Sequence, residues 1–397
     1  MATVTPLKSK TSARELLAGI KIIDVDTHLS EPHDLWTSRA PEALKNLVPR
    51  VVETDGKRQW VIGEDQFLFD TFASCSVMPD GSKARGVGFF DRDIGQIHPP
   101  AHDTKERVKF MDEQGIHAQI VYPNIMGFGG QRGMEADASL RLASVKIFND
   151  AMIDMQNESG QRIFGMALLP WWDIDESVKE TERCMKAGMK GININSDPHV
   201  HGVPSLGEKH WDPLWDLCQS NGLPVNFHIG ASDISTSWYF NAAWPEMSGE
   251  QMVTLGGLML FATNQRVMAS ILASKFLERF PELKIVSVES GAGWIPFLLE
   301  GLEYMSVEGG LDYETSPTEV FRRQIYACTF FERRNFVDTI RKVGVDNIMF
   351  ETDYPHPACL YPDSFEYMVD ALAEMTEEER FKVFSGNASR VYNIDIG

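Results

Sequence analysis

Acidic and imidazole side chains end four short apolar segments that lie far apart in the sequence. These residues are Asp26, His28, His228, Glu289 and Asp353. Carboxylates and imidazoles are the usual ligands of divalent metal ions in proteins. A carboxyl group that ends an apolar segment is costly to bury unless it is paired or bound to a metal. These residue types therefore predict one metal site, provided that the fold brings the four segment ends together.

The spacing within the first segment supports this hypothesis. Residues two apart in an extended chain point to the same side, so Asp26 and His28 can bind one ion. An Asp-x-His sequence is also typical of a strand end with a capping Asp, and a lone His228 is also typical of a hydrogen-bonded core residue. Four segments that all end in such groups favour the metal site over these separate explanations.

Eight apolar segments, several without polar alternation, predict strands of a parallel sheet that is buried on both faces. They are residues 20–26, 117–123, 164–169, 191–195, 224–228, 284–289, 324–330 and 347–353. Helix-like stretches lie between them, so the pattern indicates an α/β protein with a (β/α)₈ TIM barrel. An open doubly wound sheet is the alternative, but no GxGxxG loop follows the first segment. In a barrel, the carboxyl ends of the strands gather at one face, where the candidate ligands would meet.

The chain is expected to form a single barrel domain over residues 1–397, with two elaborations. About ninety residues separate the first two strands, which is far longer than an ordinary strand–helix connection. We interpret residues 29–109, rich in Pro, Gly, Asp and aromatics, as an insertion that either covers the barrel mouth or shapes a substrate pocket. The apolar helical region 238–280 is a second elaboration and a candidate for oligomer contacts.

Composition excludes several classes of partner. The net charge of −20 disfavours binding to nucleic acid or to an anionic membrane surface. The sequence contains no uninterrupted stretch of about eighteen apolar residues, so we expect no membrane-spanning helix. The five cysteines include no CxxC pair and are odd in number, so we expect no disulfide framework and a cytoplasmic location.

Four segments resemble the amidohydrolase superfamily, in particular the branch that includes aminocarboxymuconate-semialdehyde decarboxylase and the resorcylate decarboxylases. They are IIDVDTHLSEP (22–32), GLPVNFHIG (222–230), LKIVSVESGAGWIPFLLE (283–300) and FETDYPHP (350–357). The resemblance implies that Asp26, His28, His228 and Asp353 are metal ligands, and that Asp353 can also accept a proton from water. Members of this family usually dimerise, so a homo- or hetero-oligomer of related barrels is expected.

The chain departs from the family pattern at two places. The catalytic His that often ends the sixth strand is replaced by Glu289, which puts decarboxylation of the best-known kind in doubt. Asn193 and Asn195 stand where a carbamylated Lys would follow the fourth strand. Glu289 is then a general base, a ligand for a second metal ion, or a structural acid bonded to backbone amides.

A two-metal site is one of the alternatives that the resemblance implies. The ESGxGW and TDYPH segments are similar to a sub-branch that contains a di-iron thioester hydrolase and the subunits of a 2-aminoisobutyrate monooxygenase. His356 and His201 would be the additional ligands, although His201 can equally be an exposed loop residue. The cofactor is then zinc if one ion binds, and iron or manganese if two ions bind.

The leading functional hypothesis is hydrolysis of an amide, ester, lactone or thioester of a small molecule by metal-activated water, with Asp353 or Glu289 accepting the proton. Three alternatives remain open. They are a di-metal monooxygenase that activates dioxygen, a non-oxidative decarboxylase and a non-catalytic partner subunit.

Overall fold

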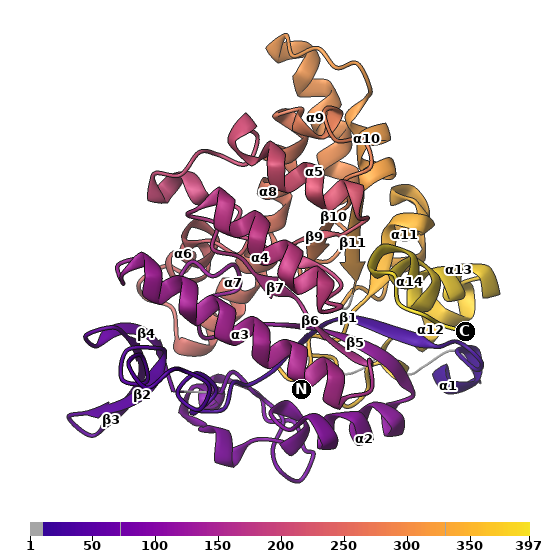
Figure 1. Cartoon of the computed structure of the whole chain (residues 1–397). Coiled ribbons are helices and arrows are strands. Elements are labelled where there is room, and N and C mark those ends of the chain that lie inside the picture. The colour runs from indigo at the N-terminus through magenta and orange to yellow at the C-terminus, as the bar shows by residue number, and fades with distance from the viewer. Residues whose placement is uncertain (1–10, 72, 330) are drawn as a thin grey trace.

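The predicted strands form a parallel sheet in the computed structural model, which describes residues 11–71, 73–329 and 331–397 (Figure 1). The first five strand positions along the chain are β1 (Ile22–His28), β5 (Ile116–Tyr122), the interrupted strand β6 (Ile163–Gly165) and β7 (Ala167–Leu168), β8 (Ile192–Asn193) and β9 (Val225–His228). The last three are β10 (Ile285–Val288), β11 (Ile325–Thr329) and β12 (Ile348–Phe350). Each pairs in parallel with its neighbours in this order.

The sheet closes on itself through backbone hydrogen bonds. Met166 joins β6 and β7, because its N–H donates to Val121 while the next N–H, of Ala167, donates to Gly191. At the other junction, the Asp353 N–H donates to the Asp26 carbonyl at 2.9 Å, and the His28 N–H donates to the Tyr354 carbonyl at 2.8 Å. These bonds join β1 to the loop after β12, so the predicted (β/α)₈ barrel is confirmed.

Helices surround the barrel and connect its strands (Figure 1). They are α2 (Thr104–Gln114), α3 (Ala138–Glu158), α4 (Ile174–Lys186), α5 (Asp212–Ser220), α8 (Thr263–Ala273), α9 (Ile295–Gly309), α10 (Pro317–Gln324) and α11 (Phe336–Val343). The short helices α1 (Ala13–Leu16), α12 (Val369–Glu374), α13 (Glu377–Phe381) and α14 (Asn387–Tyr392) lie together on one side of the molecule, near the C-terminal end of the chain (Figure 1).

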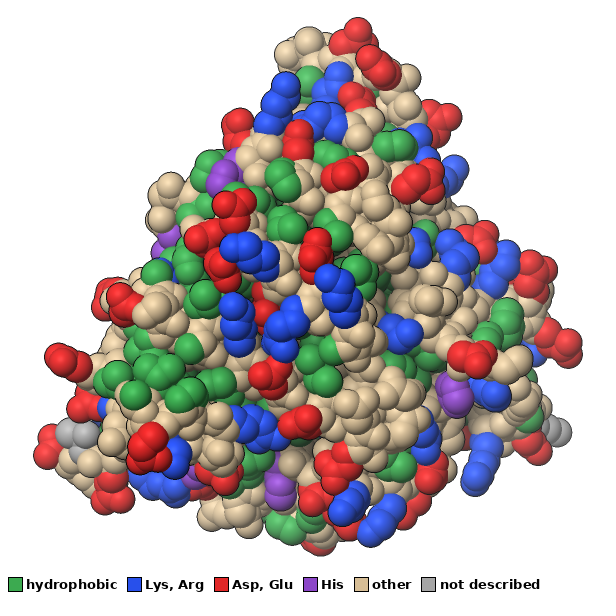
Figure 2. Space-filling model, viewed as in Figure 1, with side chains coloured by type: hydrophobic (Ala, Val, Ile, Leu, Met, Phe, Trp, Pro, Cys, Tyr) green, Lys and Arg blue, Asp and Glu red, His purple; other side chains and the backbone are tan. Residues whose placement is uncertain are grey.

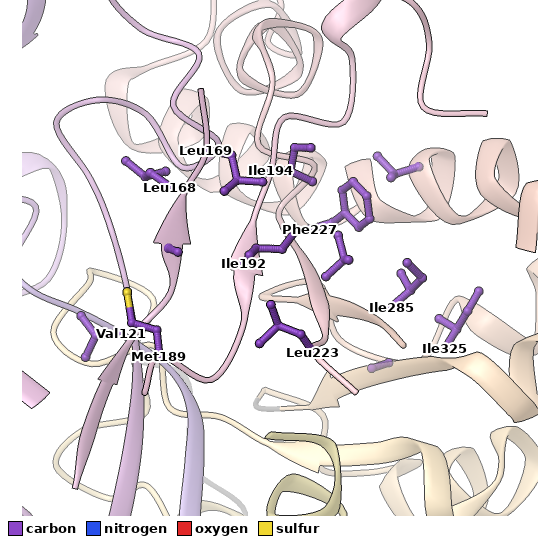
Figure 3. Close-up of a cluster of buried hydrophobic side chains, with 14 of the residues drawn as sticks. Val121, Leu168, Leu169, Met189, Ile192, Ile194, Leu223, Phe227, Ile285 and Ile325 are labelled. Atoms are coloured by element: carbon purple, nitrogen blue, oxygen red, sulfur yellow. The ribbon is translucent and has the colours of Figure 1, made fainter. Parts of the chain in front are cut away.

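Apolar side chains fill both sides of the barrel wall. Between the strands and the helices lies a large core that includes Leu168, Ile192, Phe227, Ile285 and Ile325 (Figure 3). A second core fills the barrel interior, where side chains of β1, β5 and β10 meet those of α14. Full burial of each such side chain contributes about 1.5–3 kcal/mol. The barrel is therefore a packed scaffold that holds the strand ends in fixed positions.

The segment between β1 and α2 forms a separate small sheet. Strands β2 (Arg50–Thr54), β3 (Lys57–Ile62) and β4 (Gln66–Asp70) pair antiparallel, and the short turns η1 (Val87–Asp91), η2 (Ile94–Gln96) and η3 (Pro99–Ala101) follow. The insertion expected over residues 29–109 ends earlier, because the Asp103 side chain accepts a hydrogen bond from the Glu106 N–H and starts α2 at Thr104.

The helical region 238–280 consists of several helices. It follows and overlaps α6 (Asp233–Asn241), and it contains α7 (Gly249–Phe261), α8 and the turn η6 (Phe276–Glu278). The break between α7 and α8 lies at Ala262, and α8 begins with Thr263, whose hydroxyl donates to the carbonyls of Leu260 and Ile229. This side chain fixes the new helix to the end of β9, beside the candidate site.

The surface and the helix lengths agree with the composition. On the face shown in Figure 2, acidic and basic side chains are interspersed, so the excess negative charge does not form one patch there. Across the described part of the chain, no helix combines the length and the apolar character that crossing a membrane requires.

Candidate metal centre

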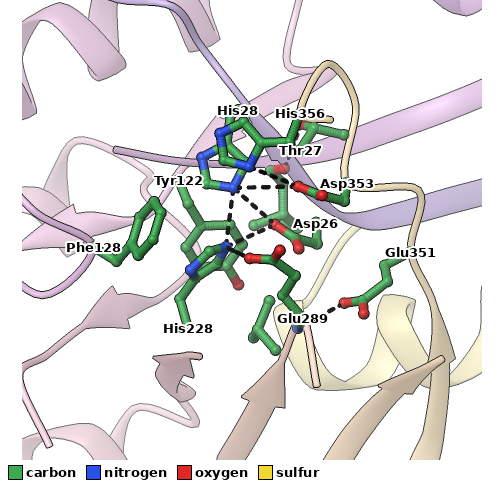
Figure 4. A network of polar contacts seen from close by, with 12 residues as sticks. Asp26, Thr27, His28, Tyr122, Phe128, His228, Glu289, Glu351, Asp353 and His356 are labelled. Carbon is green, nitrogen blue, oxygen red and sulfur yellow. Dashed lines mark hydrogen bonds and ion pairs between the residues drawn. The ribbon is translucent and has the colours of Figure 1, made fainter. Parts of the chain in front are cut away.

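Strand β1 brings Asp26 and His28 to the open end of the barrel (Figure 4). The two side chains point to the same side, as their spacing predicts, and both are buried. The distance between His28 Nε2 and Asp26 Oδ1 is 3.7 Å. Between them, the Thr27 hydroxyl donates to the Ile120 carbonyl and so fixes the strand to β5.

The ends of β9 and β10 add His228 and Glu289 to this pair. His228 and Val288 are register partners, so Glu289 follows directly beside His228. His228 Nε2 lies 3.0 Å from His28 Nε2, 3.3 Å from Asp26 Oδ1 and 3.2 Å from Glu289 Oε2. Four potential ligands from three separate strands thus converge on one point.

The loop after β12 adds Asp353 and His356. Asp353 Oδ1 lies 3.7 Å from His28 Nε2 and 2.9 Å from His356 Nδ1. The His356 ring stacks on His28 with ring centroids 3.6 Å apart. Of the seven predicted metal ligands, six are therefore brought together.

His201 is the predicted ligand that lies apart from this cluster. It belongs to the short turn η4 (Pro198–His201), and its Nε2 atom pairs with Asp233 Oδ2 at 2.8 Å. Its ring also lies against Trp171. The loop after β8 therefore directs His201 toward α6, and its sequence position alone could not reveal this direction.

The donor atoms fit a divalent cation. They form two overlapping groups whose ligand atoms all lie within 4.8 Å of one another: Asp26, His28, His228 and Glu289, and His28, Glu289, Asp353 and His356. Within the described residues, neither carboxylate oxygen of Asp26 or of Asp353 has a hydrogen-bond partner. Buried oxygens without partners are costly, and a bound metal ion satisfies them.

The electrostatics of the cluster lead to the same conclusion. Burial raises the pKa of Asp26 well above its ordinary value, and the charge of Glu351 raises it further. Burial, followed by the charge of Asp353, likewise raises the pKa of Glu289. Burial lowers the pKa of His28 and of His228 well below the ordinary value. Carboxyl groups that repel one another and neutral imidazoles are the environment that a cation stabilises.

Backbone strain marks the same strand ends. Glu289 and Asp353 have φ values of 52° and 57°, in the left-handed region that side chains other than glycine rarely adopt. The Glu289 N–H donates to the buried carboxylate of Glu351 at 3.1 Å, which helps to hold this conformation. Strained residues held by their surroundings are common at functional sites.

Glu31 and Asn124 orient His356. The Asn124 amide nitrogen donates to Leu29 and to Glu31 Oε2, so its oxygen must face His356 Nε2, 2.9 Å away. Nε2 is therefore the protonated nitrogen, and the lone pair of Nδ1 points toward Asp353. A lone pair that faces a carboxylate is favourable when a cation lies between them.

Replacement of Asn124 by alanine is expected to lower metal affinity by about 10–100-fold, because His356 loses the acceptor that fixes its protonated nitrogen. Competition with a metal-binding dye measures this affinity. The control is Asn221→Ala, at an exposed helix end, which should leave the affinity unchanged. Equal affinity in Asn124→Ala and in the unmodified protein would show that Asn124 has no such role.

Sequence reasoning missed several supporting residues. Asp24 accepts hydrogen bonds from the backbone and the hydroxyl of Thr352 and from Gln119, so it joins β1 to the loop after β12. Arg107 donates to Gln119 and to the His28 carbonyl. The signal for Asp24 was available, because it is an acid within an apolar strand.

A cavity of about 780 Å³ opens above the cluster. Glu289, Asp353 and His356 form part of its wall, whereas Asp26, His28 and His228 do not line it. Most of the remaining lining comes from the insertion, from the Phe128 loop and from α6 and α7. The Phe128 ring lies 4.5 Å from the His228 ring and covers the cluster from the side. A substrate in the cavity would thus meet three of the six ligands.

Comparison with known structures shows the same fold. An amidohydrolase from Mycobacterium avium subsp. paratuberculosis K-10 superposes with a TM-score of 0.74 at 23% identity, covering 96% of this chain and 99% of that chain. A dihydroxybenzoic acid decarboxylase from Polaromonas sp. JS666, solved with bound manganese and the inhibitor 2-nitroresorcinol, superposes with a TM-score of 0.61 at 17% identity. This match covers 94% of this chain and 97% of that chain.

Sequence comparison finds related enzymes of several kinds. The gamma-resorcylate decarboxylase of Polaromonas sp. (strain JS666 / ATCC BAA-500) is 24% identical over 77% of this chain and 92% of its own length. The 2-amino-3-carboxymuconate-6-semialdehyde decarboxylase of Dictyostelium discoideum is 22% identical over 91% of each chain. The family model described as amidohydrolase matches residues 23–394. The cluster of buried acids and histidines has the donor atoms to hold a divalent metal ion, and this chain belongs to the amidohydrolase family.

Proposed function

We propose that this protein is a divalent-metal-dependent decarboxylase of an organic acid. The observation on which the proposal depends is that Glu289, Asp353 and His356 belong to the metal-ligand cluster and also line the cavity. A carboxylic acid bound there would meet both the metal and a proton donor. Decarboxylases among the relatives support this reaction over the hydrolysis that the sequence alone favoured. None of the relatives named above is a monooxygenase.

A metal ion held by these side chains would supply positive charge to bind and polarise oxygen atoms of the substrate. The protein's own groups have the remaining tasks. In decarboxylation the bond to the carboxyl carbon breaks, CO₂ leaves, and the electron pair left on the substrate carbon takes up a proton. Glu289 is the group placed to deliver that proton, because it faces both the cavity and His228. Phe128 packs against His228 and so holds this imidazole in place within the cluster.

Hydrolysis remains the second candidate because of Glu289 itself. The resemblance implies a His at this position in the decarboxylase branch, whereas a carboxylate can accept a proton from an attacking water. The two reactions use the same ligands and differ in what the acid group does. They are therefore separated by their products rather than by the site geometry.

The test starts with protein purified without added metal, in which metal ions per chain are counted. Protein reloaded with Mn²⁺ or Zn²⁺ is then incubated with ¹³C-carboxyl-labelled aromatic and unsaturated acids and with their methyl esters. We expect metal-dependent release of ¹³CO₂, which Glu289→Gln abolishes. Metal-dependent ester cleavage without ¹³CO₂ would replace decarboxylation by hydrolysis, and protein that binds no metal would refute both.

A further inference from the structure

The cavity is far larger than a single aromatic ring requires. Its volume of about 780 Å³ lies in the upper part of the roughly 300–1,000 Å³ range of pockets for drug-sized ligands. At about 30 Å³ per water molecule, it would hold roughly two dozen waters. A one-ring acid bound at the floor would leave most of this space, and most of these waters, in contact with apolar walls.

Two additions to the barrel build these walls. From the insertion come Phe67, Phe69 and Phe89, and from α6 comes Tyr239. Helix α7 contributes Val253, Thr254, Gly257 and Phe261, whose spacing places them on one face of the helix. An apolar ligand that fills the space would displace water from these surfaces, which is favourable.

A positive charge lies within this apolar wall. Arg132 lines the cavity, donates to the Leu68 carbonyl and packs over the Phe69 ring at 4.2 Å. Among the described residues it makes no ion pair, and burial lowers its pKa to about 10, so it stays charged. The acids whose charges act on it are the exposed Asp70 and Asp233, whereas Lys83 is the cation that acts on Asp353. Its contacts with Leu68 and Phe69 place Arg132 against β4 of the insertion.

We infer that the cavity binds a bulky, largely apolar organic anion, larger than one ring, and that Arg132 binds an anionic group of this ligand. The reacting end lies at the floor beside Glu289, and this part of the inference rests on the proposed function. The size and the charge preference rest on the cavity alone, so both can be measured without turnover.

Two fluorescent probes of similar shape test the inference on the metal-loaded protein. They are 8-anilinonaphthalene-1-sulfonate and the uncharged N-phenyl-1-naphthylamine. Gly257→Phe adds a side chain to the cavity face of α7, where a Cβ meets no atom within 4 Å, and phenylalanine disrupts a helix less than glycine does. We expect this variant to bind both probes at least about tenfold more weakly. Gly301→Phe, which adds the same ring on α9 outside the cavity, should bind them normally.

The charge preference needs a second variant. Arg132→Gln should weaken binding of the sulfonate by about ten- to hundredfold, because a charge-assisted hydrogen bond is lost, and leave the uncharged probe unchanged. Arg132→Lys should restore part of the sulfonate affinity. Arg341→Gln, which removes an exposed arginine paired with Glu379, is the matched control.

The outcomes separate this inference from the proposed function. Unchanged binding of both probes to Gly257→Phe, or equal weakening of both probes in Arg132→Gln, would overturn the inference. A protein that shows the expected probe pattern but releases no CO₂ from any bulky or one-ring acid would retain the cavity's ligand class and lose the proposed reaction.

Discussion

Replacement of Asp353 by asparagine is expected to reduce turnover by at least about a hundredfold while the barrel stays folded. Asp353 is the acid of the cluster that lies beside both His28 and His356 and also lines the cavity. Asparagine has the same shape but no negative charge, so it binds a cation poorly. The fold should persist because, within the described residues, the Asp353 side-chain oxygens accept no hydrogen bond.

The closing contact of the barrel also survives this change. It is made by the Asp353 backbone N–H to the Asp26 carbonyl, which asparagine keeps. Circular dichroism and metal analysis accompany the kinetics. Asp112→Asn removes an exposed acid paired with Arg162 and should leave turnover unchanged. Near-normal turnover of Asp353→Asn would rule out the proposed role of this residue.

Removal of the metal is expected to lower the free energy of unfolding, and to lower it more at pH 8.5 than at pH 6.5. Burial raises the pKa values of Asp26, Glu289 and Asp353. In the metal-free protein these groups add stability below their unfolded pKa values, near 4, and lose it as the pH rises through their higher folded values. Between its unfolded and its folded pKa, each carboxyl group that is still protonated in the folded protein lowers the free energy of unfolding by about 1.4 kcal/mol for each unit of pH increase.

The histidines are the reason why metal-free and metal-loaded protein are compared at pH 6.5 and above, and not at lower pH. Burial lowers the pKa of His356 to about 4 and also lowers the pKa of His28 and of His228. Their contribution to stability falls as the pH drops below the unfolded value of about 6.5, which opposes the effect of the acids. At pH 6.5 each unfolded histidine is about half protonated; from about pH 7.5 upward the histidines are neutral in both states, and only the acids contribute.

Thermal unfolding of chelated and reloaded protein measures the effect. Reloading should keep Asp26 and Asp353 ionised, so the curve of melting temperature against pH should be flatter with metal than without. The difference between the two curves should increase from pH 6.5 to pH 8.5. A difference that is constant or decreases over this range would show that the buried carboxyl groups do not exchange their protons for the metal.

The barrel was predictable from the sequence because each strand is a short apolar segment with its own helix after it. The strand positions agree with the structure to within a few residues, as for residues 224–228 and β9. The ends of helices depend on finer chemistry. Asp103 starts α2 before the predicted end of the insertion, and Thr263 fixes the start of α8 within the helical region 238–280. Single side-chain hydrogen bonds of this kind leave no periodic signal.

The expected ligands at the ends of β1, β9 and β10 follow from residue type and spacing, because parallel strands bring their carboxyl ends together. The reaction does not follow in the same way. The sequence favoured hydrolysis, whereas the two relatives described above are decarboxylases. The oligomeric assembly and the cytoplasmic location stay predictions.

The sequence by itself determined that acids and imidazoles end the strands of a barrel, since each of these features is local. Only the tertiary structure decided that His356 joins the cluster while His201 turns toward Asp233. It also decided that the insertion and α7 enclose a large apolar cavity with Arg132 in its wall. The physical reason is that side-chain direction in a loop, and the space between two elaborations, depend on contacts between residues distant in the chain.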